Sequence, residues 1–365
     1  MTQYTARIAA LQALLPTLGV DALYVSHPKN ILYLTGQELS LGRLIVGKQT
    51  VTLLVDGRYI VACKEALGAI VEPYSKEKLI DLFKTQYSGK IGFEASEERY
   101  WNYMQLKELT DAAGCELTPL QKPVVALRAV KDMHEIEKIQ AACNLCVDGF
   151  DFVVASLKEG ITEKQLATEL DIFWKKRGGE CGFPSIIAFG ENTSKPHYRP
   201  KERALAKNEV VLVDIGCCLN GYHSDMTRMV FFGQVHPKIE EICTIVKNAQ
   251  ETALAACRAG ATSWQLDTAA RDVITQAGFG DHFPHSTGHG VGLDIHEDPI
   301  IKKDDAIPEV VLKPGMIITI EPGIYLPGIG GVRIEDTVVV QEGGYIQLIN
   351  RPHEALRKVM EHASC

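Results

Sequence analysis

The chain of 365 residues lacks the segments that would tie it to a membrane or to a nucleic acid. No apolar run approaches the ~20 residues that a membrane-spanning helix needs. The formal net charge is −8, and no stripe of lysine and arginine is interleaved with aromatic residues, which disfavours binding to a phosphate backbone. We therefore expect partners that are neither membrane nor nucleic acid.

The sequence also lacks a secretory signal and a disulfide framework. Residues 1–19 form a short amphipathic helix candidate without a basic start, a purely apolar core or a small-residue cleavage site. The ten cysteines are scattered, and some, such as Cys63 and Cys217, lie inside apolar runs typical of buried free thiols. Cys143 and Cys146 have CxxC spacing, but the pair lies in a helical pattern with no second CxxC. These features predict a cytoplasmic protein.

Several common catalytic motifs are missing. There is no G-x-S-x-G nucleophile elbow and no G-x-x-x-x-G-K-[ST] phosphate loop. The segment HEDPI, residues 296–300, is not an H-E-x-x-H zinc helix, because no second histidine follows at the right place and Pro299 interrupts it. These absences disfavour a serine hydrolase, a phosphate-loop enzyme and a zincin.

The composition is that of an ordinary globular protein, with 46% hydrophobic and 23% charged residues, and the length argues for two domains. In the first third, helix and strand signals alternate, which predicts a small α/β unit. The predicted helices are 7–19 and 58–68, and the predicted strands are 21–27, 43–47, 50–56 and 90–94. Two prolines then mark residues 118–130, before a long helical pattern over 131–157. We therefore predict an N-terminal domain of residues 1–124 and a catalytic domain of residues 125–365.

The second domain contains an internal repeat. Residues 160–184 and 260–284 are identical at eight of 25 positions without a gap, where chance gives roughly one or two. Each segment predicts a threonine N-cap, an amphipathic helix, a glycine at the helix end and a loop. The pattern indicates two duplicated α/β halves related by a pseudo-two-fold axis, with a site at the seam.

Acidic residues occupy matching places in these halves. Asp214 ends an apolar strand, and Asp225 follows beyond a turn-rich segment; Glu321 and Glu335 are placed in the same way. A hairpin at each place would bring the two acids of that half together. Four carboxylates in an apolar interior need either strongly raised pKa values or neutralising cations. Two divalent ions would balance the charge, and a water between them would be readily deprotonated.

The stretch HSTGHGVGLDIHE, residues 285–297, offers three histidines to such a site. His289 lies among glycines, where the backbone can approach a metal closely, and is the predicted ligand. His285 and His296 are better suited to donate hydrogen bonds to a tetrahedral intermediate or to the ligands. Each of the three could instead be a hydrogen-bonded core residue.

These motifs resemble those of the "pita-bread" metallopeptidases, and most of all the branch with Xaa-Pro aminopeptidase (aminopeptidase P) and prolidase. The resemblance covers nearly the whole chain. It is carried in the second domain by residues 211–228, 285–299, 318–325 and 330–337, and in the first by 30–36, 55–59 and the 127–139 entry to the second domain. It implies an α/β fold, with a creatinase-like N-terminal domain and a pita-bread catalytic domain.

The resemblance also implies roles for individual residues. It implies five ligands for two metal ions: Asp214 on one metal, Asp225 and Glu335 as bridges, and His289 and Glu321 on the second. Glu321 would also relay a proton from the nucleophilic water. The other residues that it places in the site are His197 on the substrate side, His285, His296, Arg333 and Tyr325. Mn(II) is the expected metal because the ligands are rich in oxygen, with Co(II) and Zn(II) as alternatives.

The same resemblance predicts hydrolysis of the bond between an N-terminal residue and proline, by a homodimer. Some prolidases carry an arginine just after HE-x-P, and here Ile300 follows, which favours an aminopeptidase acting on longer peptides. Lys302 and Lys303 keep the dipeptide-cleaving prolidase open as the alternative. The N-terminal domain argues against a methionine aminopeptidase. A metal-free binding module is disfavoured because all five ligands are present.

Overall fold

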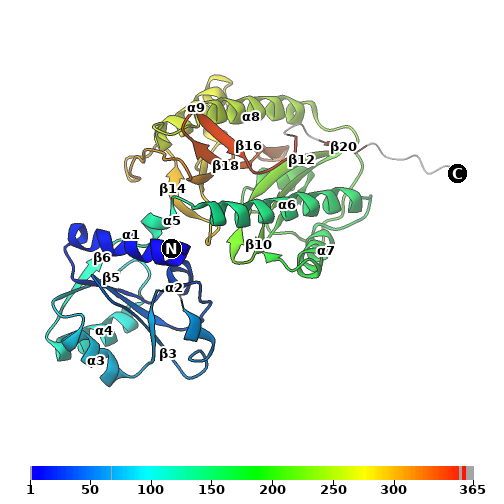
Figure 1. Ribbon diagram of the computed structural model, residues 1–365. Coiled ribbons are helices and arrows are strands. Elements are labelled where there is room, and N and C mark those ends of the chain that lie inside the picture. The colour runs from blue at the N-terminus through cyan, green and yellow to red at the C-terminus, as the bar shows by residue number, and fades with distance from the viewer. Residues whose placement is uncertain (1, 67, 353–355, 359–365) are drawn as a thin grey trace. The chain divides into compact units, whose positions relative to one another are not determined.

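The computed structural model describes residues 2–66, 68–352 and 356–358. The chain forms two compact units, Met1–Arg128 and Ala129–Cys365 (Figure 1). The boundary predicted at residue 124 lies directly before the short helix α5 (Val125–Arg128), which ends the first unit.

The first unit is built on one six-stranded mixed sheet, in the order β4-β3-β2-β1-β5-β6. Strands β1, β2 and β3 are antiparallel neighbours, whereas β4, β5 and β6 each run parallel to the neighbour nearer the centre. The strands are β1 (Ala22–Val25), β2 (Arg43–Gly47), β3 (Val51–Val55), β4 (Ile70–Pro73), β5 (Lys90–Glu94) and β6 (Glu116–Leu120). The helices are α1 (Gln3–Leu18), α2 (Pro28–Thr35), α3 (Lys76–Thr85) and α4 (Tyr100–Ala113). The predicted small α/β unit is confirmed.

The helix predicted over residues 58–68 is wrong. The described residues of this span, 58–66 and 68, contain turns and a single 3₁₀ segment, η1 (Ala62–Glu65). Cys63 is fully buried, but Val61 is 72% exposed, so the segment has no continuous apolar face to pack on the sheet. A helix this short needs such tertiary packing, because nucleation costs more than its few hydrogen bonds return.

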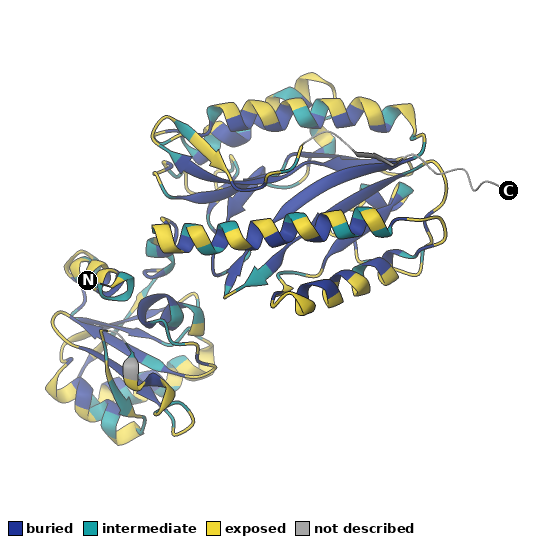
Figure 2. Cartoon of the chain, turned by 45° about the vertical axis from the view of Figure 1, so that its right-hand side comes forward, coloured by how far each residue is buried: buried dark blue, intermediate teal, exposed yellow. Residues whose placement is uncertain are grey.

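In the second unit, helices cover strands whose residues are mostly buried (Figure 2). The helices are α6 (Met133–Ser156), α7 (Glu163–Lys176), α8 (Pro237–Ala256) and α9 (Ser263–Gln276). A four-stranded sheet contains β8 (Ile186–Phe189), β9 (Glu209–Ile215), β12 (Met226–Phe232) and β20 (Leu356–Lys358). A five-stranded sheet contains β13 (Gly288–Gly290), β14 (Glu297–Ile301), β15 (Ile317–Ile320), β18 (Asp336–Gln341) and β19 (Gly344–Gln347). Smaller sheets contain β7 (Glu180–Cys181), β10 (Cys217–Leu219), β11 (Tyr222–His223), β16 (Gly323–Leu326) and β17 (Gly330–Arg333), and two 3₁₀ segments are η2 (Gly190–Ser194) and η3 (Gly280–His282).

The predicted duplication is visible in the secondary structure. Thr162 and Thr262 are the N-caps of α7 and α9, and each forms a capping box with the glutamine three residues later. After each helix comes an antiparallel pair, β9–β12 in the first half and β15–β18 in the second. An isolated bridge between Thr227 and Glu335 joins these two pairs, which makes the seam between the halves.

Helix α6 is long and apolar enough, by length and composition alone, to cross a membrane. Its buried residues instead include Ile139, Phe150 and Val153 along one face, the pattern of a core helix in a globular domain. It packs on α7 at Gly149, where a Cβ atom would come within 1.9 Å of the buried Trp174 ring.

We expect Gly149→Ala to lower the free energy of unfolding by about 1–3 kcal/mol, although alanine is the better helix former. The added methyl group would force the Trp174 ring out of its packed position. Denaturant unfolding would measure the change. Gly344→Ala is the matched control, because its Cβ would meet nothing within 4 Å; an equal effect in both variants would contradict this packing.

Candidate metal centre

The first hairpin holds Asp214 and Asp225 where its strands meet. Asp214 lies near the end of β9, opposite Thr227 of β12, and Asp225 directly precedes β12. Both acids are buried, with 7% and 5% of their surface exposed. The hairpin predicted from their spacing is therefore present.

The second half contributes two more acids and a histidine. Glu321 directly follows β15 and Glu335 directly precedes β18, so they occupy the places that Asp214 and Asp225 hold in the first half. His289 lies in β13, beside β15. At Gly288, a Cβ atom would come within 1.9 Å of the Thr319 carbonyl oxygen. Only glycine permits β13 to approach β15 this closely, and the approach brings His289 to the acids.

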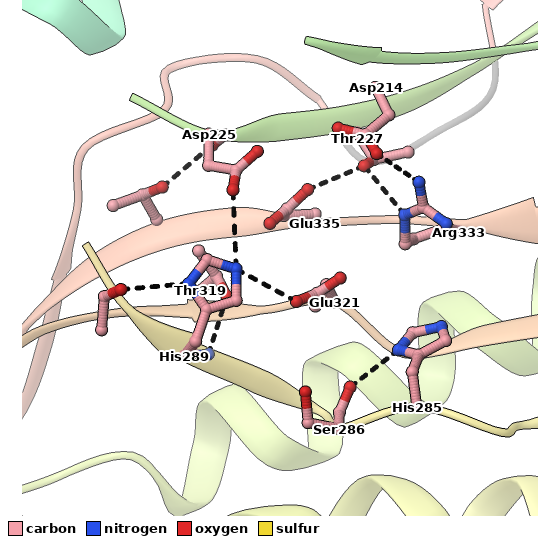
Figure 3. Close-up of polar contacts among 12 residues, drawn as sticks. Asp214, Asp225, Thr227, His285, Ser286, His289, Thr319, Glu321, Arg333 and Glu335 are labelled. Atoms are coloured by element: carbon pink, nitrogen blue, oxygen red, sulfur yellow. Dashed lines mark hydrogen bonds and ion pairs between the residues drawn. The ribbon is translucent and has the colours of Figure 1, made fainter. Parts of the chain in front are cut away.

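The side chains of Asp225 and Glu321 point to the His289 ring, whereas Asp214 lies beside Arg333 (Figure 3). The His289 Nε2 atom lies 3.6 Å from Asp225 Oδ2 and 3.4 Å from Glu321 Oε1. One ligand atom each of Asp225, His289 and Glu335 lie within 4.8 Å of one another. Carboxylate and imidazole groups at this spacing match the donor set of a divalent metal ion.

The His289 ring is oriented for ligation. Its Nδ1 lies 3.0 Å from the carbonyl oxygen of Gly290, which can only accept a hydrogen bond. Nδ1 therefore carries the proton, and Nε2 presents its lone pair to Asp225 and Glu321. Burial, followed by the charge of His296, lowers the pKa of His289 to about 4, so the ring is neutral at pH 7.

The negative charges of the acids are not balanced by neighbouring positive charges. Burial raises the pKa of Glu321 to about 8, with a further contribution from Asp214. Burial and the neighbouring carboxylates also raise the pKa values of Asp225 and Glu335 well above the usual range. One oxygen of Glu335, Oε1, is buried and has no hydrogen-bond partner within the described part of the chain. A cation placed among these groups would supply the missing charge and the missing partner, so the residues fit a metal.

A network of hydrogen bonds from Arg333 and Thr227 orients two of the acids. Arg333 donates hydrogen bonds to Asp214, to the hydroxyl of Tyr325 at 2.6 Å and to that of Thr227 at 3.2 Å. Thr227 donates in turn to Glu335 Oε2, at 2.7 Å. The arginine and threonine side chains thereby orient one acid from each half of the fold.

The structure gives His285 a different setting from the predicted one. Its Nδ1 lies 2.8 Å from the Ser286 carbonyl oxygen, and its Nε2 lies 2.8 Å from the Tyr325 hydroxyl. Arg333 donates to that same hydroxyl, which leaves the tyrosine proton to point at Nε2. Burial lowers the pKa of His285 to about 3. Both nitrogens of this neutral ring are thus engaged by the protein, and neither is available to donate to a reaction intermediate in this conformation.

The two other predicted histidines are exposed. The His296 ring lies edge-on to His289, with centroids 4.4 Å apart. A charge on His197 would lower the pKa values of both His285 and His296, which places His197 within electrostatic range of the site. All three predicted histidines that are not ligands therefore lie around the acid cluster.

The residue missed by the sequence analysis is Thr227. The duplication contained the signal for it, because the segments Asp225-Met-Thr227 and Glu335-Asp-Thr337 are equivalent. In the structure, Thr337 donates a 2.9 Å hydrogen bond to the carbonyl oxygen of Asp225. Each threonine thus supports the acid of the opposite half.

Four acids and one buried imidazole lie between duplicated hairpins, with Asp214, Asp225 and Glu335 buried and Glu321 partly buried, and this donor set defines the class of a metal-dependent hydrolase. Comparison with known proteins agrees. Residues 137–342 match the model of metallopeptidase family M24, and residues 7–130 match the creatinase/prolidase N-terminal domain.

Relatives match over their whole length. A Xaa-Pro dipeptidase of Pyrococcus furiosus is 34% identical over 354 residues, which are 96% of this chain and 99% of that protein. The structure of a Xaa-Pro dipeptidase from Bacillus anthracis has a TM-score of 0.91 at 31% identity, covering 97% of this chain and 100% of the other. An X-Pro aminopeptidase from Thermotoga maritima has a TM-score of 0.86 at 29% identity, covering 96% and 100%.

The chain therefore belongs to metallopeptidase family M24. It combines the catalytic domain of that family with a creatinase/prolidase N-terminal domain. The predicted pita-bread architecture is confirmed. The family implies divalent metal ions, and the cluster around His289 is where the structure offers ligands for them.

The raised pKa of Glu321 predicts how the stability of the metal-free protein depends on pH. The folded protein holds this proton up to about pH 8, whereas the unfolded chain releases it near 4.5. The folded state therefore binds more protons between these values, and stability falls as pH rises through the window. We expect a loss of about 2 kcal/mol between pH 6.5 and 8.5, measured by denaturant unfolding in chelator. Glu321→Gln should flatten this slope; stability that rises with pH would contradict the burial of charge.

Proposed function

We propose that this protein is a Xaa-Pro dipeptidase, which hydrolyses the bond between an N-terminal residue and proline with the help of two divalent metal ions. The observation that carries the proposal is the joint occurrence of the acid cluster around His289 and full-length similarity to proteins named Xaa-Pro dipeptidase. The sequence analysis favoured the aminopeptidase, but the relatives' names favour the prolidase alternative.

Five residues would hold the metals: Asp214, Asp225, His289, Glu321 and Glu335. Asp225, His289 and Glu335 lie within reach of one ion, and His289 also lies near Glu321, which supports a shared metal site; the bridging roles of Asp225 and Glu335 are part of the proposal. Two divalent cations, when bound, supply Lewis-acid activation of water and of the scissile carbonyl group. We propose Mn(II), because four of the five ligands offer oxygen; Co(II) and Zn(II) are the alternatives.

The chain's own groups would handle the protons and the substrate. Glu321 would accept a proton from water and pass it on, the role that the family resemblance implies for it. The exposed His296 and His197 can face the peptide and donate hydrogen bonds to the developing oxyanion. The prolyl nitrogen must be protonated as it leaves, and the proton held by Glu321 can serve. Arg333 would orient Asp214, and Tyr325 would orient His285, each through a hydrogen bond.

A Xaa-Pro dipeptidase and a Xaa-Pro aminopeptidase differ in the length of peptide that they cleave. The observation that favours an aminopeptidase is the residue after HEDP. Ile300 pairs with His289 across β13 and β14, so both side chains extend from the same face of the sheet, and Ile300 is 38% exposed. An isoleucine there cannot bind the carboxylate of a dipeptide. Lys302, the nearby cation, pairs with Asp304 at 3.0 Å.

The test compares Ala-Pro with Ala-Pro-Ala as substrates in Mn(II). For a dipeptidase we expect kcat/KM on Ala-Pro to exceed that on the tripeptide by at least about tenfold, the effect of one productive interaction with the terminal carboxylate. Preferred cleavage of Ala-Pro-Ala would establish the aminopeptidase instead. Failure to cleave either peptide, with metal bound, would refute the proposed function.

We expect Asp225→Asn to abolish turnover, with a fall in kcat/KM of more than about 100-fold, because the amide cannot supply the bridging charge. Metal analysis should show fewer ions per chain in the same variant. Asp272→Asn, an exposed aspartate on α9, is the control and should leave both quantities unchanged. Near-normal activity of Asp225→Asn would remove this residue from the ligand set.

We further propose that the protein is a cytoplasmic homodimer. The cytoplasmic location is supported by the cysteines, since the nine that fall within the described residues form no disulfide with one another. Light scattering would test the dimer, and a monomer alone would count against it.

A further inference from the structure

A buried carboxylate outside the metal cluster receives four hydrogen bonds from a single segment. Glu163 is the first residue of α7 and is fully buried. Its Oε1 accepts from the backbone N–H of Phe189 at 2.9 Å and from Asn192 at 3.1 Å. Its Oε2 accepts from the hydroxyl of Tyr198 at 2.7 Å and from the backbone N–H of Lys201 at 3.2 Å.

The segment that Glu163 holds is the one that carries His197. Residues 189–201 leave the sheet at the end of β8 and return to the start of α7, where Lys164 N–H donates to the Lys201 carbonyl oxygen. Asn192 also donates to the hydroxyl of Tyr198, at 2.9 Å, which closes the network. Burial and the adjacent Glu163 raise the pKa of Tyr198, so its hydroxyl remains a donor.

His197 itself is exposed and has no side-chain hydrogen bond among the described residues. The place of its ring therefore depends on the backbone on either side. The next residue, Tyr198, is 5% exposed and is anchored to Glu163. A shift of this anchor moves His197 directly.

The second half of the domain also has a buried acid on a helix that binds a neighbouring loop through hydrogen bonds. Asp267 of α9 is fully buried, and it accepts hydrogen bonds from Thr287 at 2.7 Å and from Arg271. Arg271 also donates to the carbonyl oxygen of His285, at 2.9 Å. A buried acid on the equivalent helix thus holds the loop that carries a site histidine in each half.

We propose that Glu163 is a positioning residue, which fixes the segment 189–201 so that His197 faces the substrate. The inference rests on the proposed function and on the substrate-side place of His197. Glutamine cannot replace this carboxylate, because the four donors include one backbone N–H on each oxygen. Whichever way the amide is turned, its NH₂ group faces one of these N–H groups and leaves it without an acceptor.

The experiment measures kcat/KM on Ala-Pro and Ala-Pro-Ala for Glu163→Gln with Mn(II). We expect a fall of about 10- to 100-fold, the effect of a displaced catalytic or binding group. Glu169→Gln is the matched control, since this exposed residue lies on the same helix, and it should behave as the wild type. Tyr198→Phe removes one hydrogen-bond donor to Glu163 and keeps the carboxylate, so its kcat/KM should fall by a smaller factor. This second variant tests the proposal if Glu163→Gln does not fold.

A double-mutant cycle with His197→Ala separates positioning from general stability. If Glu163 acts through His197, adding Glu163→Gln to His197→Ala should cause little further loss. If Glu163→Gln lowers kcat/KM by the same factor in the His197→Ala background as in the wild-type background, the proposal is overturned. An unchanged kcat/KM in the Glu163→Gln single variant would also overturn it.

Hydrogen exchange of the amides in residues 189–201 gives a reading that does not need activity. Faster exchange confined to this segment in Glu163→Gln supports the positioning role, and unchanged protection overturns it. If the wild-type protein cleaves no Xaa-Pro peptide, the proposed function fails, and the exchange data still decide whether Glu163 holds the segment.

Discussion

The structure depends on one electrostatic constraint, the gathering of four buried or partly buried carboxylates around one imidazole. Burial raises the pKa values of Asp225, Glu321 and Glu335, and the neighbouring carboxylates raise them further, whereas Arg333 lowers them. Arg333 offers the cluster one positive charge from behind, which cannot balance four acids. This imbalance favours the binding of divalent cations at the cluster.

The duplicated fold builds this cluster from equivalent acids of its two halves. Each half supplies a hairpin with one acid on either side of its turn, and the threonine two residues beyond the second acid supports the opposite half. The halves have diverged at one decisive place. Val211 and Ile318 lie three residues before the first acid of each half, and they pair with Phe189 of β8 and Gly290 of β13. This register puts Ala188 where the second half has His289, so only one half offers an imidazole as a candidate metal ligand.

Much of this could be predicted from the chain. The alternation of apolar and polar residues, the threonine caps and the repeat predicted the α/β units, the duplicated halves and the hairpins around Asp214 and Glu321. These features are local, or they repeat locally, and periodicity reports them directly. The helix predicted over residues 58–68 failed because periodicity cannot tell whether an apolar face will find a partner.

The sequence by itself therefore determined the fold class, the family and the set of acids and histidines from which the site is made. Only the tertiary structure decided which atoms of that set are free. His285, predicted to face a reaction intermediate, is engaged at both nitrogens by Ser286 and Tyr325, whereas His289 keeps Nε2 free because Gly290 fixes its other nitrogen. The physical reason is that a hydrogen bond depends on partners far apart in the chain, and spacing along the sequence does not report them.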